Sequence, residues 1–374
     1  MAASLVQAGV EVHVATTIVP DEAATRHLAM GQPTLVHSWT CYYFPRQSNF
    51  YKFSMSLLTW LHEHVRDYDL VHVHALFSFA SIAACRAARR AGVPYVVRPL
   101  GLLNQWGMKN RRRHIKALSF RLVERPLLNA AAAIHYTSTS EQQEASSLNL
   151  KARSVVIPLG IDTSSFHQLP SRDKFEGRYP QAQNRELILF LSRLDPKKGL
   201  EILLQAMSLL VKSRPKVLLI IAGSGADAYV SKLHAIVENL GLGEHILWTG
   251  FLGHEEKCAA LGAADVFVLP SKSENFGIAL LEAMSAGMAC VTTSGVALGA
   301  EAAAAGAVRL ASYDSASIAA ALGDLLESPE ARASLGRAAQ SLAERQYSLK
   351  AMGRALKSLY TELSGHTARS IRPA

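Results

Sequence analysis

The chain has 374 residues, of which 49% are hydrophobic and 18% charged, and its formal net charge is +9. This length exceeds what one hydrophobic core usually organises, so two domains are expected, and the composition excludes a disordered or fibrous protein. No apolar run reaches the roughly 18 residues that span a bilayer. The four cysteines are far apart and have no metal-ligand spacing, which predicts buried free thiols in a reducing compartment.

The positive charge is concentrated in the first half of the chain. Residues 1–165 contain 17 Lys and Arg against 10 Asp and Glu, whereas the remainder contains 22 against 20. The basic residues cluster at Arg86, Arg89 and Arg90 and in the run 109–116, KNRRRHIK. Two interpretations stay open, a solvated face or contact with anionic lipid headgroups or a lipid diphosphate. No nucleic-acid motif accompanies this patch, so nucleic acid is not expected as a partner.

Strands and helices alternate through the first half. Residues 1–9 have the pattern of a helix end that stops at Gly9, and they lack the basic segment of a secretory signal. The expected strands are 10–16, 70–74, 95–98, 133–137 and 155–158. The expected helices are 55–67, 79–91, 112–131 and 141–148, the last introduced by the capping sequence STSE.

The segment 161–185 is rich in polar residues, Pro and Gly and is interpreted as an interdomain linker. Beyond it the expected strands are 187–192, 216–222, 246–249, 266–269 and 289–293. The expected helices are 200–211, 228–239, 255–261, 278–286, 315–326, 330–344 and 350–363. The pattern predicts the α/β class, with two doubly wound Rossmann-like domains, 1–160 and 186–345, that face a cleft. The tail 346–374 is expected to supply a helix that can cross back to the first domain.

The most informative segment is SENFGIALLEAMSAG, residues 273–287. It places Glu274 in a loop after a predicted strand and Glu282 inside the following helix. The backbone N–H groups of Phe276, Gly277 and Ile278 should point toward an anion at the start of that helix, where the helix dipole favours negative charge. Carboxylates beside such a position suit the recognition of sugar hydroxyls. This combination predicts a nucleotide sugar as ligand.

Three other loops follow predicted strands at the same edge of the second domain. The loop SRLDPKKG, 192–199, carries Arg193 and Lys198, which can supply two positive charges to a diphosphate without a metal ion. The turn GSG contains Gly223 and Gly225, whose missing side chains permit close backbone approach. The apolar tip of the loop 250–252 can pack on a base.

Taken together, SRLDPKKG, AGSG and ADVFVLPSKSENFGIALLEAMSAG resemble the donor half of glycosyltransferase family 4, retaining enzymes of the GT-B fold. The first half resembles the same family through VHVHALFSF, RPLGLLNQW, RPLLNAAAAIHYTS and IPLGID. Members with such first halves mostly build bacterial exopolysaccharide or lipopolysaccharide on lipid-linked acceptors.

The resemblance implies a role for each matching residue. Glu274 takes the place of the acid that contacts the hydroxyls of the donor sugar, and Glu282 that of the acid that holds the nucleotide ribose. Arg193 and Lys198 match the basic pair that neutralises the leaving diphosphate. The backbone of Asn275, Phe276 and Gly277 matches the part that binds the distal phosphate or the sugar, and the turn with Gly223 and Gly225 belongs to the same donor-binding set.

Two departures from the family pattern stand out. The family's histidine after the third strand is replaced by Leu100, which leaves Arg98 and His74 as the candidate catalytic groups of the first domain. The chain also begins inside the first helix, so the first strand and its glycine-rich loop are expected to be missing. A late start site and an impaired form both remain open.

The resulting expectation is a metal-independent retaining hexosyltransferase in cell-surface polysaccharide synthesis, with no cofactor besides its nucleotide-diphosphate sugar. The acceptor is expected to be a saccharide or a lipid-linked molecule, and the location cytoplasmic or peripheral on the inner face of the membrane. Two alternatives stay open: another GT-B activity, such as a phosphorylase or an epimerase, and a non-catalytic nucleotide-sugar-binding protein.

Overall fold

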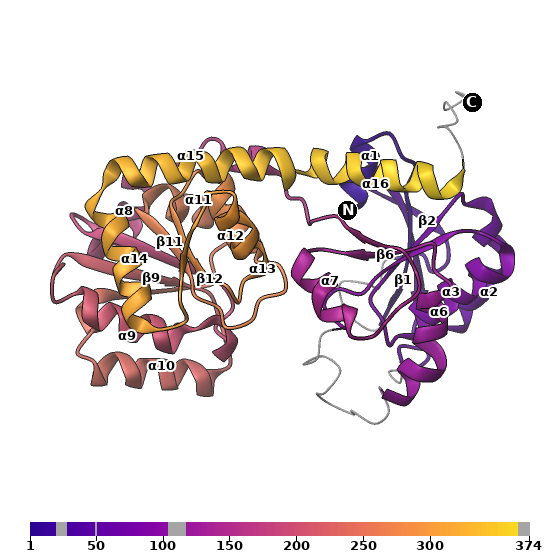
Figure 1. Cartoon of the computed structure of the whole chain (residues 1–374), viewed down its shortest axis with the longest axis horizontal. Helices are drawn as coiled ribbons and strands as arrows, with labels where there is room; N and C mark the ends of the chain where they lie inside the picture. The colour runs from indigo at the N-terminus through magenta and orange to yellow at the C-terminus, as the bar shows by residue number, and fades with distance from the viewer. Residues whose placement is uncertain (20–27, 49–50, 104–116, 366–374) are drawn as a thin grey trace. The chain divides into compact units, whose positions relative to one another are not determined.

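The computed structural model describes residues 1–19, 28–48, 51–103 and 117–365 (Figure 1). The chain divides into two compact units, Met1–Gly160 with Leu349–Ala374, and Ile161–Ser348. Each unit is an α/β structure built on parallel strands, as the alternating pattern predicts. The basic run 109–116 lies outside the described residues.

The second unit contains one six-stranded parallel sheet in the order β10-β9-β8-β11-β12-β13. Its strands are β8 (Glu186–Leu191), β9 (Val217–Ala222), β10 (Ile246–Gly250), β11 (Val266–Leu269), β12 (Cys290–Thr293) and β13 (Arg309–Ala311). The helices around it are α8 (Arg172–Arg178), α9 (Leu200–Leu210), α10 (Asp227–Asn239), α11 (His254–Ala263), α12 (Ile278–Ser285), α13 (Ala297–Ala304), α14 (Ser315–Glu327) and α15 (Pro329–Gln346). The strand order reverses between β8 and β11, which is where doubly wound sheets bind ligands.

Both faces of this sheet are covered. Helix α9 packs with α14 and with α10, while α8 packs on α11 and α12 on α15 (Figure 1). Strands β9 and β11 are buried at every position because helices cover both of their faces, and their sequences are accordingly continuous apolar runs. The strands and helices predicted for this unit are present within two residues, and three further elements, α8, α13 and β13, were not predicted.

The segment 161–185, predicted as a linker, lies in the second unit and contains helix α8. Phe175 anchors this helix with 2% of its surface exposed. Arg172 ties it to the unit through hydrogen bonds to the carbonyl of Arg185 at 2.6 Å and to the carboxylate of Asp265 at 3.4 Å. One buried aromatic residue and one arginine therefore hold this segment against the second unit.

The first unit contains two sheets. A parallel sheet has the order β4-β5-β6-β7, with strands β4 (Val71–His74), β5 (Tyr95–Arg98), β6 (Ala133–Tyr136) and β7 (Ser154–Val156). A second sheet has the order β1-β3-β2, with β1 (His13–Ile18), β2 (Pro33–Val36) and β3 (Trp39–Pro45), of which β2 and β3 are antiparallel. Among the described strands, β1 pairs with β3 alone and β4 with β5 alone. The absence of a preceding strand and glycine-rich loop stays a prediction.

Helices in the first unit surround both sheets. They are α1 (Ala2–Gln7), α2 (Met55–His64), α3 (Phe79–Ala91), α6 (Arg125–Asn129), α7 (Thr139–Ser146) and α16 (Leu349–Ser364). The helix predicted over 112–131 is described only from residue 117, and it includes a π-helical turn, Phe120–Glu124, before α6. Helix α16 packs against α1 (Figure 1), and its residues Met352, Leu356 and Leu359 share a core with Leu5 and Val96.

Candidate active site

The loop after β8 brings two cations to the carboxyl edge of the sheet in the second unit. Asp195 accepts a hydrogen bond from the backbone N–H of Lys197 at 3.0 Å and so begins the short 3-10 turn Pro196–Lys198. The turn directs Lys198 inward, where it is buried, whereas Arg193 is exposed. The Arg193 charge is near enough to lower the pKa of Lys198, in addition to the larger effect of burial.

The glycine turn after β9 packs directly on this loop. A Cβ atom at Gly223 would lie 1.8 Å from the carbonyl oxygen of Ser192, so no other residue fits there without displacing backbone. Next to it, the N–H of Leu194 donates to the carbonyl of Ser224 at 2.8 Å, and Leu194 pairs with Gly225 in an isolated bridge. The two predicted glycines therefore set the position of the loop that carries Arg193 and Lys198.

The acidic loop after β11 is held by the chain that follows β12. The N–H of Glu274 donates to the carbonyl of Gly295 at 2.8 Å, and the N–H of Ala297 donates to the carbonyl of Glu274 at 3.2 Å. A hydrogen bond of 2.8 Å from the N–H of Lys272 to the carbonyl of Lys197 joins this loop to the loop 192–199, called the lysine loop below. Backbone contacts thus set the position of Glu274 relative to Lys198.

Lys198 and Glu274 form an ion pair between the Nζ and Oε2 atoms. Their side chains are 11% and 21% exposed, so the pair is largely withdrawn from water but can still be reached by a ligand. The predicted cation and the predicted sugar-contacting acid therefore lie side by side, and each neutralises the other when no ligand is bound.

Helix α12 begins beside this pair. Gly277 has a φ of +103°, and a Cβ there would lie 2.7 Å from Cγ1 of Val296 and 3.8 Å from Cγ of Glu274, so this turn requires glycine. No described residue accepts a hydrogen bond from the backbone N–H of Phe276 or Gly277. These groups, with the first N–H groups of the helix, are donors for an anion next to Glu274.

The side chains of this turn have different roles. Asn275 is exposed, whereas the ring of Phe276 is 3% exposed and lies edge-on to Tyr347 with a centroid distance of 6.1 Å. Phe276 therefore stabilises the turn from the core, and its backbone is the part that remains for a ligand.

Glu282 pairs with a lysine that the sequence did not reveal. The Nζ atom of Lys257, on α11, donates to Oε1 of Glu282 at 2.5 Å, and the two side chains are 18% and 17% exposed. Lys257 lies in the sequence HEEKCAA, where it has the pattern of an ordinary helix-surface residue. Only the contact of α11 with Glu282 of α12 distinguishes Lys257 from such a residue. In the loop 250–252, Phe251 is the exposed tip, at 79%, while Leu252 is buried.

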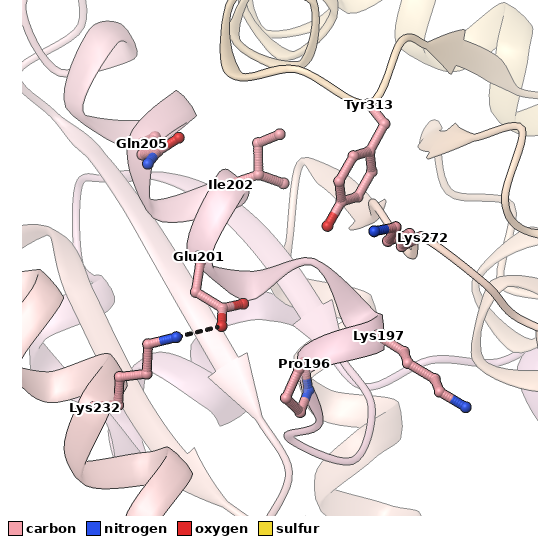
Figure 2. Close-up of a pocket in the computed structure, with 8 residues that line it drawn as sticks. All are labelled: Pro196, Lys197, Glu201, Ile202, Gln205, Lys232, Lys272 and Tyr313. Carbon is pink, nitrogen blue, oxygen red and sulfur yellow. Dashed lines mark hydrogen bonds and ion pairs between the residues drawn. The ribbon is translucent and has the colours of Figure 1, made fainter. Parts of the chain in front are cut away.

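A pocket of about 460 Å³ lies beside the lysine loop. Figure 2 shows the hydroxyl of Tyr313 pointing into the space between Glu201 and Lys272, and Lys232 paired with Glu201, at 3.3 Å. Pro196 and Lys197, which belong to the loop 192–199, also line the pocket. The pocket lining includes none of the predicted donor residues Arg193, Lys198, Glu274 and Glu282. The predicted donor residues therefore lie outside this pocket.

His74 and Arg98 are together in the first unit, at the carboxyl ends of β4 and β5, where they are paired in register. Arg98 is 4% exposed, and its Nε–H has no hydrogen-bond partner among the described residues. His74 is exposed, and its ring stacks on that of His72 with a centroid distance of 4.9 Å. His74 is thus the solvent-facing member of a larger polar cluster.

The buried part of this cluster is a directional chain of hydrogen bonds. His135 Nε2 lies 2.7 Å from the carbonyl of Ile157, which can only accept, so this nitrogen carries the proton. The Nδ1 atom of neutral His135 must then accept from Nε2 of His72, at 3.3 Å, and Nδ1 of His72 must accept from the hydroxyl of Tyr360, at 2.5 Å. Burial lowers the pKa of His135 to about 4, consistent with neutral rings.

Two family models match the chain in succession. Residues 1–160 match a glycosyl transferase 4-like domain, and residues 171–342 match the glycosyl transferases group 1. The chain belongs to glycosyltransferase family 4. Among the described residues of this family 4 member, none of the helices is both long enough and apolar enough to cross a membrane, and no group of three His, Cys, Asp or Glu side chains is placed to hold a metal ion.

Curated relatives of this family 4 chain include two mannosyltransferases of Mycolicibacterium smegmatis. A phosphatidyl-myo-inositol mannosyltransferase is 36% identical over 189 residues, which cover 49% of this chain and 45% of the relative. A GDP-mannose-dependent alpha-(1-6)-phosphatidylinositol monomannoside mannosyltransferase is 34% identical over 143 residues, 36% of this chain and 37% of the relative. The matches thus span less than half the length of either relative.

Solved structures resemble the family 4 chain over most of its length. Anabaena Alr3699/HepE, in complex with UDP and glucose, has a TM-score of 0.69 at 20% identity, over 86% of each chain. The sucrose-phosphate synthase of Thermosynechococcus elongatus has a TM-score of 0.73 at 19% identity, over 97% of this chain and 91% of the other. WaaG, a glycosyltransferase involved in lipopolysaccharide biosynthesis, has a TM-score of 0.65 at 17% identity, over 98% and 94%. These likenesses establish the GT-B fold.

Proposed function

We propose that this chain transfers a hexosyl group, with retention of configuration and without a metal ion, from a nucleotide-diphosphate sugar to a saccharide or lipid-linked acceptor. The observation that carries the proposal is the meeting of a cation, an acid and a helix start at one point of the second unit. Lys198 contacts Glu274, and Gly277 opens helix α12 beside them. A diphosphate bound there would have its charge opposed by a side chain and by backbone N–H groups.

The arrangement suits the charge changes of glycosyl transfer. Positive charge develops on the anomeric carbon and negative charge on the departing diphosphate, so the useful groups are an acid at the sugar and cations at the phosphates. In the proposed donor complex Glu274 accepts from the hydroxyls of the sugar, while Arg193 and Lys198 face the diphosphate. The departing phosphate takes the acceptor proton as the acceptor attacks from the same face.

Glu282 is assigned to the ribose. It lies on the second turn of α12, and its ion pair with Lys257 leaves a carboxylate that can accept from two neighbouring hydroxyls. Because Glu274 and Glu282 serve different parts of the donor, the separation rule for the two carboxylates of glycoside hydrolases does not apply to them. In the first unit, His74 and Arg98 are proposed to face the acceptor or a phosphate.

A ligand panel followed by a turnover assay tests this function. Thermal unfolding is measured with UDP-glucose, GDP-mannose and other nucleotide sugars, and the donor raises the midpoint in proportion to its occupancy. Release of nucleoside diphosphate is then followed for the native chain, for Glu274→Ala and for Glu244→Ala, an exposed control in the same unit. Loss of turnover in the first variant alone supports the proposal. Binding without turnover in the native chain would favour the non-catalytic alternative, and full activity of Glu274→Ala would overturn the assignment.

A further inference from the structure

A second pocket, of about 510 Å³, lies in the first unit between α2 and α3. Its walls are mostly apolar and come from three separate segments of the chain. The apolar lining residues are Phe53, Leu58, Phe79, Ile82, Ala83, Ala87 and Val123. A volume in this range suits a ligand of tens of heavy atoms, and the apolar walls favour a hydrocarbon.

Cationic side chains stand on the rim of the pocket. Arg86 and Arg90, one helical turn apart on α3, line it and are exposed, and His62 of α2 lines it as well. No carboxylate is among its described lining residues. The acids next to lining residues in the sequence are Glu63, which is exposed, and Glu124, which is 2% exposed and accepts a hydrogen bond from Ser119 at 2.8 Å. Burial raises the pKa of Glu124, and the nearby Arg86 charge lowers it. The lining itself contains two guanidinium groups and no carboxylate, so the rim has a net positive charge.

The surface next to the pocket is apolar as well. Leu118 and Leu122 precede Val123 by five residues and one residue and are 60% and 63% exposed. They are four positions apart in a helical segment, so they share one face. Met55, at the start of α2, is 51% exposed. Exposed apolar side chains beside an apolar pocket and a basic rim form the pattern of a membrane-interface surface.

We propose that this pocket takes up an acyl chain of an anionic phospholipid, with the lipid phosphate on Arg86 and Arg90 and with Leu118 and Leu122 in the interfacial layer. The joint presence of the apolar volume and the cationic rim favours an anionic amphiphile over other occupants. A neutral apolar ligand would not use the arginines, and a soluble phosphate compound would not fill the apolar volume. This inference goes beyond the proposed function and does not depend on it, since it concerns a surface and not the transfer reaction.

Vesicle flotation of the full chain tests the rim. Vesicles of phosphatidylcholine alone are compared with vesicles that contain phosphatidylglycerol. The native chain should bind the anionic vesicles more strongly, and the double variant Arg86→Gln and Arg90→Gln should bind them about 30-fold more weakly, because each basic residue near an anionic surface contributes about fivefold. Arg66→Gln, an exposed arginine of the same unit that does not line the pocket, is the matched control and should bind like the native chain. Equal binding of the rim variant and the control would overturn the proposal.

The apolar part is tested by surface and pocket variants. Leu122→Ser should weaken binding about tenfold through the loss of buried hydrocarbon, whereas Leu35→Ser, which alters a leucine 75% exposed on β2, should not. Phosphatidylglycerol with a photoreactive acyl chain should label peptides that contain Ile82 or Val123 in the native chain, and Ile82→Asn should lose that label. Labelling confined to other peptides would contradict the assignment. So would sedimentation showing that the same surface pairs two copies of the chain.

Discussion

The charged groups of the two candidate sites differ in whether they are paired within the protein. In the second unit each acid of the candidate site is already paired with a lysine, Glu274 with Lys198 and Glu282 with Lys257. In the first unit the candidate site has a buried guanidinium, Arg98, whose Nε–H has no partner among the described residues, beside histidines that are held neutral.

This difference bears on which existing contacts a ligand would have to replace in each unit. If the donor binds as proposed, it exchanges the ion pairs of Glu274 and Glu282 for contacts with its own phosphates and hydroxyls, so its affinity is a difference between two sets of contacts. In the first unit Arg98 forms no ion pair with a described residue, although the buried carboxylate of Glu141 is near enough to act on its pKa. The comparison predicts that substitutions in the second unit alter donor affinity and rate, and that those in the first unit alter stability and its dependence on pH.

The largest effect is expected at Glu274. Glu274→Gln keeps the shape of the side chain but removes the charge, and it should lower turnover on the order of 100-fold or more, because the negative charge faces the developing positive charge of the sugar. Turnover is measured by the release of nucleoside diphosphate at saturating donor. Unchanged thermal stability would separate this loss from misfolding, and a loss below tenfold would place the reacting sugar elsewhere.

The next effect concerns pH and the first unit. The pKa of His135 is about 4 in the folded protein and about 6.5 unfolded. The unfolded chain therefore takes up a proton first as the pH falls below 6.5, so stability is full above 6.5 and is lost toward pH 4. His135 alone should contribute on the order of 3 kcal/mol to this loss.

Hydrogen exchange resolved by peptide checks this pH effect. Peptides of β6 should lose protection between pH 6.5 and 4 before those of β8 do. His135→Gln should flatten the dependence in β6, although the variant starts from a lower stability. Parallel loss of protection in both units would show that the histidine chain does not control the acid response.

A smaller effect is expected at Lys198. Lys198→Ala removes one charged contact to the diphosphate, and it should weaken binding of UDP or GDP by about 10- to 100-fold, in keeping with 1.5–3 kcal/mol for a hydrogen bond to a charged group. Part of this loss is offset because Glu274 no longer has to be separated from its partner. Calorimetric titration measures the change, with the exposed Lys212→Ala as control. Equal affinities in both variants would contradict the assignment.

The smallest effect is expected at Lys257. A substitution there distinguishes contacts to the nucleoside of the donor from contacts to its phosphates. Lys257→Met keeps most of the apolar stem and frees Glu282, so affinity for a nucleoside diphosphate should change by only a few-fold. Affinity for inorganic pyrophosphate should stay the same, because the ribose is absent from it. A change for pyrophosphate as large as that for UDP or GDP would place Lys257 at the phosphates.

Much of the second unit could be predicted from the sequence, because its strands are continuous apolar runs. The loops after these strands contain the charged residues and glycines of the candidate site. The β2–β3 hairpin could not be predicted in the same way. Its two-residue turn is His37-Ser38, without the Asn-Gly or Asp-Gly that usually signals such a turn, and His37 has a φ of +53°. Helix α13 was missed because its alanine-rich sequence shows little periodicity. Strand β13 was missed because its three residues, RLA, are too few to show a period.

Within the candidate site, the residue types and their order along the chain were predictable, but the contacts among them were not. The ion pair of Lys198 with Glu274 joins positions 76 residues apart, and it depends on backbone hydrogen bonds between loops that the sequence does not relate. The role of Lys257 as partner of Glu282 could not be predicted, because its sequence neighbours have the pattern of an exposed helix surface. Its contact with Glu282 arises only from the placement of α11 beside α12.

Helix α16 has a consequence for biosynthesis. Its residues Met352, Leu356 and Leu359 complete a core that begins with Leu5 and includes Val96 and Ala133. The whole second unit, Ile161–Ser348, therefore leaves the ribosome before helix α16, the last part of the first unit, emerges. During translation the later unit is free to fold while the earlier one still exposes an apolar face, which makes that nascent face a natural substrate for chaperones.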